Sequence, residues 1–157
     1  GDESRGAQHV QEMVRIPGVN GVATAGEGGI PDDHIVDVHH FPRGLLTHIP
    51  EGHIEACFFV EARGESMTEA KISPGDMLLV CPTVPARSGD ICVVVVENEA
   101  LVKRVSITRH DAGDIERIIL YSESPGFEPM DISNRDFRIV GKVMHATTYF
   151  GNGGTGQ

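Results

Sequence analysis

Short apolar runs, each preceded by a turn that ends in Gly-Asp, constrain the fold of this chain more than any other feature. The turn Ser-Pro-Gly-Asp at 73–76 precedes the run MLLV, and Arg-Ser-Gly-Asp at 87–90 precedes ICVVVV. Apolar, often β-branched runs of this length between turn residues are typical of strands and too short for most helices. The sequence therefore predicts a mostly β domain.

Further strands follow the same pattern, with turns expected near 98–99 and at 110–114. We expect the strands to form a curled, partly barrel-like sheet with little helix beyond one short turn at 42–46. The additional predicted strands are CFFVEAR (57–63), ALVKRVSI (100–107), IERIILY (115–121) and FRIVGKVMHATT (137–148).

The 157 residues suit a single domain. Residues 1–21 are predicted to be a linker or N-terminal arm, 22–148 the folded domain and 149–157 a disordered tail. Residues 22–34 are rich in glycine and other small residues, so this segment is predicted to be a loop. The three cysteines form no CxxC pair and are interpreted as reduced residues in a cytoplasmic protein.

Charge and hydropathy exclude some functions. Thirteen basic and 23 acidic residues give a net charge of −10, which argues against direct DNA binding because phosphate contacts need clustered lysine and arginine. No apolar run approaches the length needed to span a membrane.

Lys103 is the most informative single residue. Side chains alternate between the two faces of a strand, so Lys103 shares an apolar face with Leu101, Val105 and Ile107, while Arg104 points the opposite way. A lysine among aliphatic side chains is poorly solvated, which favours the neutral amine that a general base requires. The alternative is a lysine that extends its amine to solvent at the sheet edge.

Ser66 lies in RGESMTEAKISPGD, just beyond the end of a predicted strand. A serine in such a turn can present its hydroxyl beside backbone N–H groups, an arrangement that stabilises an oxyanion. The G-x-S-x-G elbow is absent because Thr68 occupies the second glycine position. On local sequence alone, an ordinary turn serine is the alternative.

Residues 60–105 together resemble the self-cleaving Ser–Lys peptidase domain of the LexA, UmuD and lambda-type phage repressor family. The resemblance rests on Gly64-Glu65-Ser66-Met67, on Val102-Lys103-Arg104 and on the two Gly-Asp strands between them, and it extends more weakly to about residue 148. It implies that Ser66 is the nucleophile and Lys103 the base. It also implies an oxyanion site formed by backbone N–H groups near Glu65 and Ser66.

The resemblance further implies that the chain cuts itself at Ala25–Gly26, within VATAGEGG. A tethered substrate has a high effective concentration, so a slow site can still act on itself. The alternatives are that AGEGG is only a flexible loop, or that the other Ala-Gly pair, Ala112–Gly113, is cut. The second is disfavoured because that pair lies in a tight hairpin turn.

Histidines suggest two competing sites. His34, His39 and His40 lie near Asp32, Asp33 and Asp37, but their spacing matches no standard zinc pattern. We therefore expect no metal and no cofactor. A Ser–His–Asp triad that uses one of these histidines with Ser66 remains an alternative to the Ser–Lys pair.

The resemblance implies a dimeric transcriptional repressor of the DNA-damage response, whose cleavage is stimulated by a RecA–single-stranded-DNA filament. DNA would be bound only through an N-terminal helix-turn-helix domain, for which the residues before Gly26 are too few. Alternatives are a UmuD-like accessory of a translesion polymerase, whose short arm these residues match, and a dimerisation module that never cuts. A signal-peptidase relative is a further alternative, disfavoured because no membrane anchor is evident.

Overall fold

The computed structural model describes residues 12–22, 34–63, 72–123 and 126–148. Nine strands and two single-turn 3-10 helices make up this part of the chain. Their bounds are β1 (Met13–Val19), β2 (Ile35–Pro42), η3 (Arg43–Leu46), η4 (Ile54–Ala56), β3 (Phe58–Glu61), β4 (Met77–Cys81), β5 (Ile91–Val96), β6 (Glu99–Arg109), β7 (Ile115–Tyr121), β8 (Met130–Asp131) and β9 (Phe137–Thr147).

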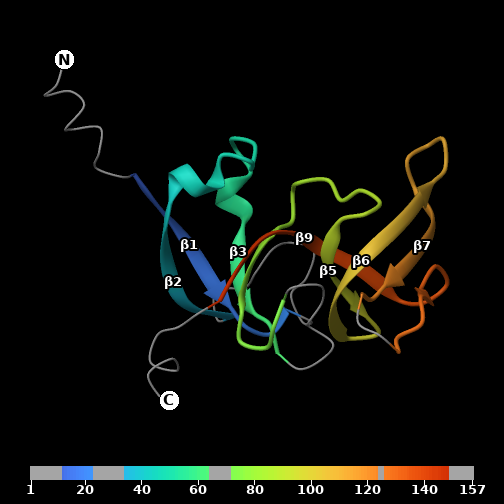
Figure 1. Ribbon diagram of the computed structural model, residues 1–157. Helices are drawn as coiled ribbons and strands as arrows, with labels where there is room; N and C mark the ends of the chain where they lie inside the picture. The colour runs from blue at the N-terminus through green and yellow to red at the C-terminus, as the bar shows by residue number, and fades with distance from the viewer. Residues whose placement is uncertain (1–11, 23–33, 64–71, 124–125, 149–157) are drawn as a thin grey trace, which may run out of the picture.

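All of these strands belong to one mixed sheet, in the order β2-β1-β3-β4-β9-β5-β6-β7-β8 (Figure 1). β1 and β3 are parallel, whereas the other neighbouring strands are antiparallel. The sheet has β2 at one edge and β8 at the other, so it does not close into a barrel. The prediction of a mostly β fold with little helix is confirmed for the described residues, and η3 falls at the predicted helical turn.

β9 joins the two halves of the sheet, because it pairs with β4 on one side and with β5 on the other (Figure 1). Its pairing with β5 shifts register between Val93 and Val94. Gly141 lies beside this shift, and a Cβ atom there would come within 3.0 Å of the Pro82 backbone. Bulges bend and twist strands locally. Because Gly141 has no side chain, β9 can pass close to the segment that follows β4.

β5 is apolar along its whole length because side chains on both of its faces are buried. A two-residue turn, Glu97–Asn98, connects it to β6, with φ angles of 51° and 73°. Turns of this kind match the right-handed twist of paired strands, and asparagine tolerates the positive φ. The turn predicted at 98–99 therefore lies one residue earlier.

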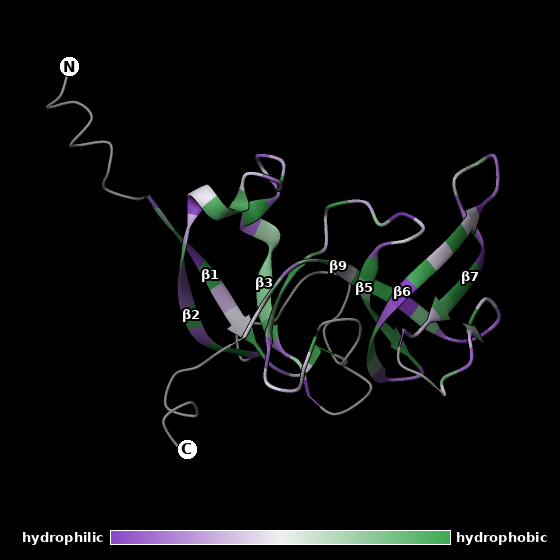
Figure 2. Ribbon diagram, viewed as in Figure 1, coloured by the Kyte–Doolittle hydropathy of each residue, from purple (hydrophilic) through white to green (hydrophobic). Residues whose placement is uncertain are grey.

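Three clusters of buried side chains cover the sheet, and Figure 2 shows apolar residues concentrated along its strands. Alternation along β3 sends Phe58 to one cluster and Phe59 to another. Cluster 1 contains Val19, Val22, Phe58, Val60, Ala62, Ile72, Leu78, Val80, Val93 and Val102. Cluster 2 contains Ile16, Leu46, Ile49, Ile54, Cys57, Phe59, Leu79 and Cys81. Cluster 3 contains Cys92, Val94, Val96, Leu101, Val105, Ile118, Leu120 and Ile132.

Two strands at the start of the sheet were not predicted. β1 lies within residues 1–21, for which the sequence predicted a linker or arm, so the sheet begins earlier than expected. Pro17 and Gly18 disfavour a strand locally, but residues 13–19 pair along their length with β2. Pairing with a distant segment therefore decides the structure of residues 13–19. The predicted tail, residues 149–157, lies outside the described part of the chain.

The cysteines also differ from the prediction. Cys57, immediately before β3, forms a disulfide with Cys81 at the end of β4. The interpretation of three reduced cysteines is therefore wrong for this pair, whereas Cys92 is a buried free thiol. The two bonded residues lie opposite each other only through the register of β3 and β4, which no local pattern reveals.

Candidate active site

Lys103 lies in the middle of β6, on the face that the alternation predicted. Its neighbours Leu101 and Val105 are buried in cluster 3, whereas Val102 points to the opposite face and is buried in cluster 1. Cys92 of β5 is the residue paired with Lys103 across the strands. The lysine is half-buried, and the pairing of β6 with β7 begins at the next residue, Arg104.

The amine of Lys103 rests against an aromatic ring. Its Nζ atom lies 5.2 Å from the centroid of the Phe127 ring. Among the described residues, no carboxylate forms an ion pair with Lys103. Within the described part of the chain, the amine therefore lies against an aromatic ring and not against a carboxylate.

Cys92 is the other potential nucleophile next to Lys103. Burial, and secondly the nearby Asp90 carboxylate, raise the pKa of the Cys92 thiol to about 12, although Lys142 acts in the opposite direction. Because a nucleophilic cysteine must be a thiolate, Cys92 is an inert core residue.

Ser66 and Glu65 lie outside the described residues, but hydrogen bonds join the two ends of the segment that contains them. The Ala62 N–H donates to the Asp76 carbonyl oxygen at 2.8 Å, and the Gly75 N–H donates to the Ala62 carbonyl oxygen at 2.8 Å. These bonds continue the β3–β4 pairing beyond Glu61 and Met77. The chain thus leaves the sheet after Ala62 and returns beside it.

Asp76 stabilises this return. Its carboxylate accepts a hydrogen bond from the Ser73 N–H at 2.9 Å, and its own N–H donates to the Ser73 carbonyl oxygen at 3.1 Å. Asp76 is the one charged residue among the buried residues of the described chain, with 4% of its surface exposed. The sequence predicted the turn, but not the burial of its carboxylate.

Ala25 and Gly26 also lie outside the described residues, between Val22 and His34. The Asn20 N–H donates to the His34 carbonyl oxygen at 3.0 Å and closes the loop at its base. Val22 is 4% exposed and belongs to cluster 1. The Arg138 guanidinium of β9 donates to the Val22 carbonyl oxygen at 3.3 Å.

Cluster 1 brings these three segments together. It contains Val22 at the root of the loop, Ala62 and Ile72 on either side of the Ser66 segment, and Val102 of β6, whereas the Lys103 side chain lies on the opposite face of β6 with cluster 3. A hollow of about 230 Å³ adjoins this meeting point. Its lining residues are Val19, Asn20, Gly21, Val22, Val60, Glu61, Arg63 and Ala100.

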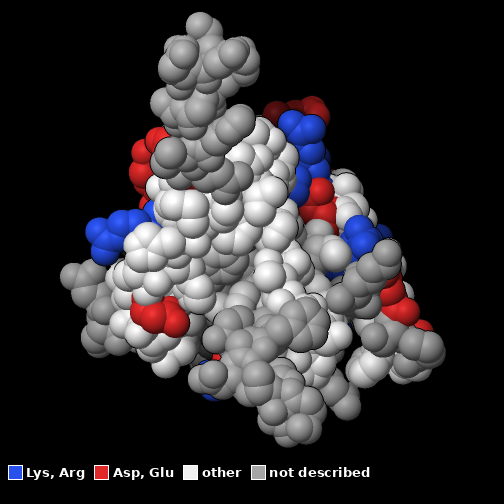
Figure 3. All heavy atoms as spheres, turned by 60° about the vertical axis from the view of Figure 1, so that its left-hand side comes forward, with Lys and Arg blue, Asp and Glu red and all other residues white. Residues whose placement is uncertain are grey.

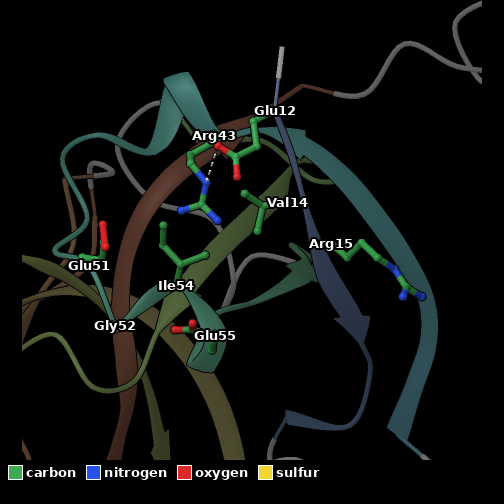
Figure 4. A pocket seen from close by; sticks show the side chains of 8 residues that line it. All are labelled: Glu12, Val14, Arg15, Arg43, Glu51, Gly52, Ile54 and Glu55. Carbon is green, nitrogen blue, oxygen red and sulfur yellow. Dashed lines mark ion pairs between the residues drawn. The ribbon is translucent and has the colours of Figure 1, made fainter. Parts of the chain in front are cut away.

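A second hollow, of about 420 Å³, lies at the start of β1, at the opposite end of that strand from Val19 of cluster 1 (Figure 4). Arg43 and Glu12 form an ion pair at its rim, with Nε and Oε1 3.4 Å apart. The surface is a mixture of both charges without a buried polar group, so it defines no catalytic site. Its lining residues are Glu12, Val14, Arg15, Arg43, Glu51, Gly52, Ile54 and Glu55.

His39 of β2 packs against cluster 2. The His39 ring lies 5.0 Å from the Phe59 ring, which belongs to cluster 2, and its Nε2 atom is 3.2 Å from Asp37 Oδ1. The Ser–His–Asp triad stays an alternative prediction, because Ser66 lies outside the described residues. In the described part of the chain, no three histidine, cysteine or acidic residues converge as metal ligands.

The face that carries β1 and β2 shows a broad area without charged side chains, with charges mostly at its margins (Figure 3). No basic patch of the kind that phosphate binding requires is visible on this face. Within the described residues, no helix is long and apolar enough to cross a membrane.

Several residues near the site were not predicted. Arg138 is 116 positions from Val22 in sequence, and Phe127 lies well beyond the strand that it contacts, so neither has a local signal. Asp76 did have a local sequence signal, because the Gly-Asp turn occurs twice in the sequence.

The sheet and the segments gathered at cluster 1 define a β domain that packs the root of its own N-terminal loop against its core. Residues 17–144 match the family model described as Peptidase S24-like. This match covers most of the chain, so the chain belongs to the S24-like peptidase family.

The chain is similar to several proteins named LexA repressor. It is 32% identical to that of Colwellia psychrerythraea over 142 residues, 88% of this chain and 62% of the relative. For Desulfitobacterium hafniense the identity is 31% over 134 residues, 85% and 58% of the two chains. For Geobacter sp. (strain M21) it is 39% over 89 residues, 55% and 41%. The chain thus spans less than two thirds of the length of these repressors.

Proposed function

We propose that this chain is the self-cleaving and dimerising C-terminal domain of a LexA-like or phage-type transcriptional repressor. Ser66 is the nucleophile, Lys103 is the general base, and Ala25–Gly26 is the bond that is cut. The S24-like peptidase family and the similarity to LexA repressors support the class of the protein.

Cluster 1 is the observation that most strongly supports self-cleavage. Val22 lies three positions before Ala25, Ala62 precedes the Ser66 segment, and Val102 brings the backbone of β6 to the same core, although the Lys103 side chain itself lies on the opposite face of that strand, beside Leu101 and Val105. Three segments that are far apart in sequence therefore pack into one core. A substrate loop rooted beside its own nucleophile reacts intramolecularly, which gives a large kinetic advantage over an external peptide.

The proposed reaction proceeds through an acyl-enzyme. The neutral Lys103 amine accepts the Ser66 hydroxyl proton while the oxygen attacks the Ala25 carbonyl carbon. Backbone N–H groups of Glu65 and Ser66 stabilise the resulting oxyanion. The proton then passes to the Gly26 nitrogen as the peptide bond breaks. Water hydrolyses the ester and releases Ser66.

Alkaline incubation followed by mass spectrometry tests this reaction. The proposed general base acts as a neutral amine, so the purified chain should yield two fragments, 1–25 and 26–157, and yield them faster at higher pH. Ser66→Ala and Lys103→Ala should each lower the rate by at least about 10³-fold. Gly26→Glu should also block the cut, because a bulky side chain keeps the loop out of the cleft.

Two variants serve as matched controls. Lys142→Met removes a lysine that pairs with Asp90 rather than with the site, and Ser88→Ala removes a serine whose hydroxyl bonds the Ile107 backbone. Both should cleave at nearly the wild-type rate. Cleavage at another bond, or normal cleavage in Lys103→Ala, would refute the assignment.

The repressor role adds a regulatory step. The LexA relatives are longer than this chain, which implies a further segment beyond this domain. Because this domain is acidic, we assign DNA binding to that further segment. Dimerisation would place two such segments on one operator, and the cut would separate them. RecA–single-stranded-DNA filaments should therefore accelerate cleavage of the full-length protein at neutral pH, and operator affinity should fall as fragments appear.

A further inference from the structure

Cys57 and Cys81 face each other at the open end of the β3–β4 hairpin. The paired residues run from Phe58 with Val80 to Glu61 with Met77, and the cysteines are the next pair outwards. Their Cα atoms are 4.4 Å apart. This is the spacing of a non-hydrogen-bonded pair in antiparallel strands, and it lies within the range that a disulfide spans. The strand register alone therefore brings the two thiols within bonding reach.

Apolar side chains enclose the pair. Cys57 is 2% exposed and Cys81 is 0% exposed, and both belong to cluster 2. The Cys57 N–H donates to the Ile54 carbonyl oxygen at 3.0 Å, so η4 lies directly against the bond. Because both residues are almost fully buried, a small reductant or oxidant reaches the sulfur atoms only when the structure around them opens locally.

We propose that Cys57 and Cys81 are a reversible oxidation site, which a low-molecular-weight disulfide such as oxidised glutathione converts from dithiol to disulfide. When the open end of the hairpin unfolds locally, the Cys57 thiol becomes exposed and ionises, and its thiolate attacks the small disulfide and releases one small thiol. The Cys81 thiolate then attacks the Cys57 sulfur and releases the second. Two protein thiols and one small disulfide become one protein disulfide and two small thiols.

The bond links residues separated by 24 positions, and these include the whole segment that carries Ser66. A cross-link of this kind restricts the unfolded chain and stabilises the folded one. The bond lies at one end of the hairpin, and the Ala62 hydrogen bonds lie at the other. Oxidation therefore strengthens the hairpin at the end opposite to Ala62, and the inference rests on the hairpin alone rather than on the proposed function.

Counting accessible thiols in the full chain tests the site. One sample is incubated with oxidised glutathione at pH 8 for several hours, and a second with dithiothreitol. Both are then unfolded in urea with N-ethylmaleimide and weighed by mass spectrometry. The oxidised chain should carry one label, on Cys92, and the reduced chain three. The melting temperature of the oxidised chain should be higher by about 6–12 °C.

Single-cysteine variants make the result specific. Cys92→Ser should keep the melting shift and lose one label in each sample. Cys57→Val and Cys81→Ala cannot form the bond, so neither should show the shift. If either variant fails to fold, the wild-type label count still decides.

Three labels after oxidation, a bound glutathione instead of the internal bond, or an equal melting shift in Cys57→Val would overturn the proposal. A chain that forms the bond but never cleaves itself would instead contradict the proposed function and leave this site intact.

Discussion

The Ser-Pro-Gly-Asp turn at 73–76 and the Arg-Ser-Gly-Asp turn at 87–90 share their hydrogen bonds but not their surroundings. In the first, Asp76 Oδ2 accepts the Ser73 N–H at 2.9 Å. In the second, Asp90 Oδ2 accepts the Arg87 N–H at 2.8 Å. Each turn leads directly into a strand. The same four-residue pattern therefore builds the same local structure twice.

The two turns also attach to their neighbours in the same way. Gly75 and Gly89 have φ angles of 93° and 97°. The Gly75 N–H donates to the Ala62 carbonyl oxygen, and the Gly89 N–H donates to the Val105 carbonyl oxygen, both at 2.8 Å. Ala62 and Val105 each return a bond to the carbonyl of the turn aspartate.

The two turns differ in how deeply their aspartates are buried. Asp76 is buried, and its turn ends the segment that contains Ser66. The Asp90 side chain is 20% exposed and lies 3.3 Å from the Lys142 amine. Because the two turns have the same hydrogen bonds, those bonds account for how each turn starts a strand. The different burial of the two aspartates comes from where each turn lies in the fold.

The largest expected effect is on self-cleavage. Asp76→Ala should slow cleavage by about 10–100-fold at a temperature well below unfolding, because displacing a reacting group by about 1 Å can have this cost. Asp90→Ala should change the rate by less than about threefold. Fragment formation at alkaline pH measures both rates. Asp76→Asn, which keeps an acceptor oxygen, should recover part of the loss, and equal rates in the two alanine variants would refute the comparison.

Stability should also separate the aspartates. Asp76→Ala should lower the free energy of unfolding by about 2–3 kcal/mol, because it removes a buried charged acceptor. Asp90→Ala should cost about 1 kcal/mol, since water can reach the exposed turn. Urea unfolding of both variants in the Ser66→Ala background avoids cleavage during the measurement. A larger cost for Asp90 would contradict the burial argument.

The glycines should behave alike. A Cβ atom at Gly75 or Gly89 meets no heavy atom within 4 Å, so only the positive φ opposes alanine. Gly75→Ala and Gly89→Ala should each cost about 1–2 kcal/mol of unfolding free energy. Matched urea titrations measure the two values. A clear difference would mean that the turns are not equivalent in their backbones.

The ion pair of the second turn should matter less. Lys142→Met keeps the aliphatic part of the side chain and removes the charge beside Asp90. The expected loss is about 0.5 kcal/mol in low salt and less in 1 M salt, because screening weakens partly exposed pairs. A loss that does not depend on salt would indicate a packing effect instead.

The two turns also illustrate what the sequence could predict. The strands after them were located correctly because apolar runs and turn residues act locally, and the alternation in β6 placed Lys103 on the correct face. β1 was missed because Pro17 and Gly18 disfavour a strand until β2 and β3 pair with it. The burial of Asp76 depends on contacts across the fold, which a four-residue pattern does not contain.

The smallest expected effect concerns pH. Burial first, and Asp90 second, raise the pKa of Cys92 from 9.0 to about 12. The unfolded chain therefore loses this proton near pH 9, whereas the folded chain keeps it, so its contribution to stability is full below pH 9 and declines as pH rises toward 12.

Asp90→Asn removes the second cause and should lessen that decline by a few tenths of a kcal/mol. Urea titrations at pH 8 and 10 measure the decline, with Cys92→Val as the variant that lacks it. Because Asp76 has no thiol at the corresponding position two residues later, where Leu78 stands, Asp76→Asn should leave the decline unchanged. An equal change in both asparagine variants would show that it arises from the loss of a carboxylate in general.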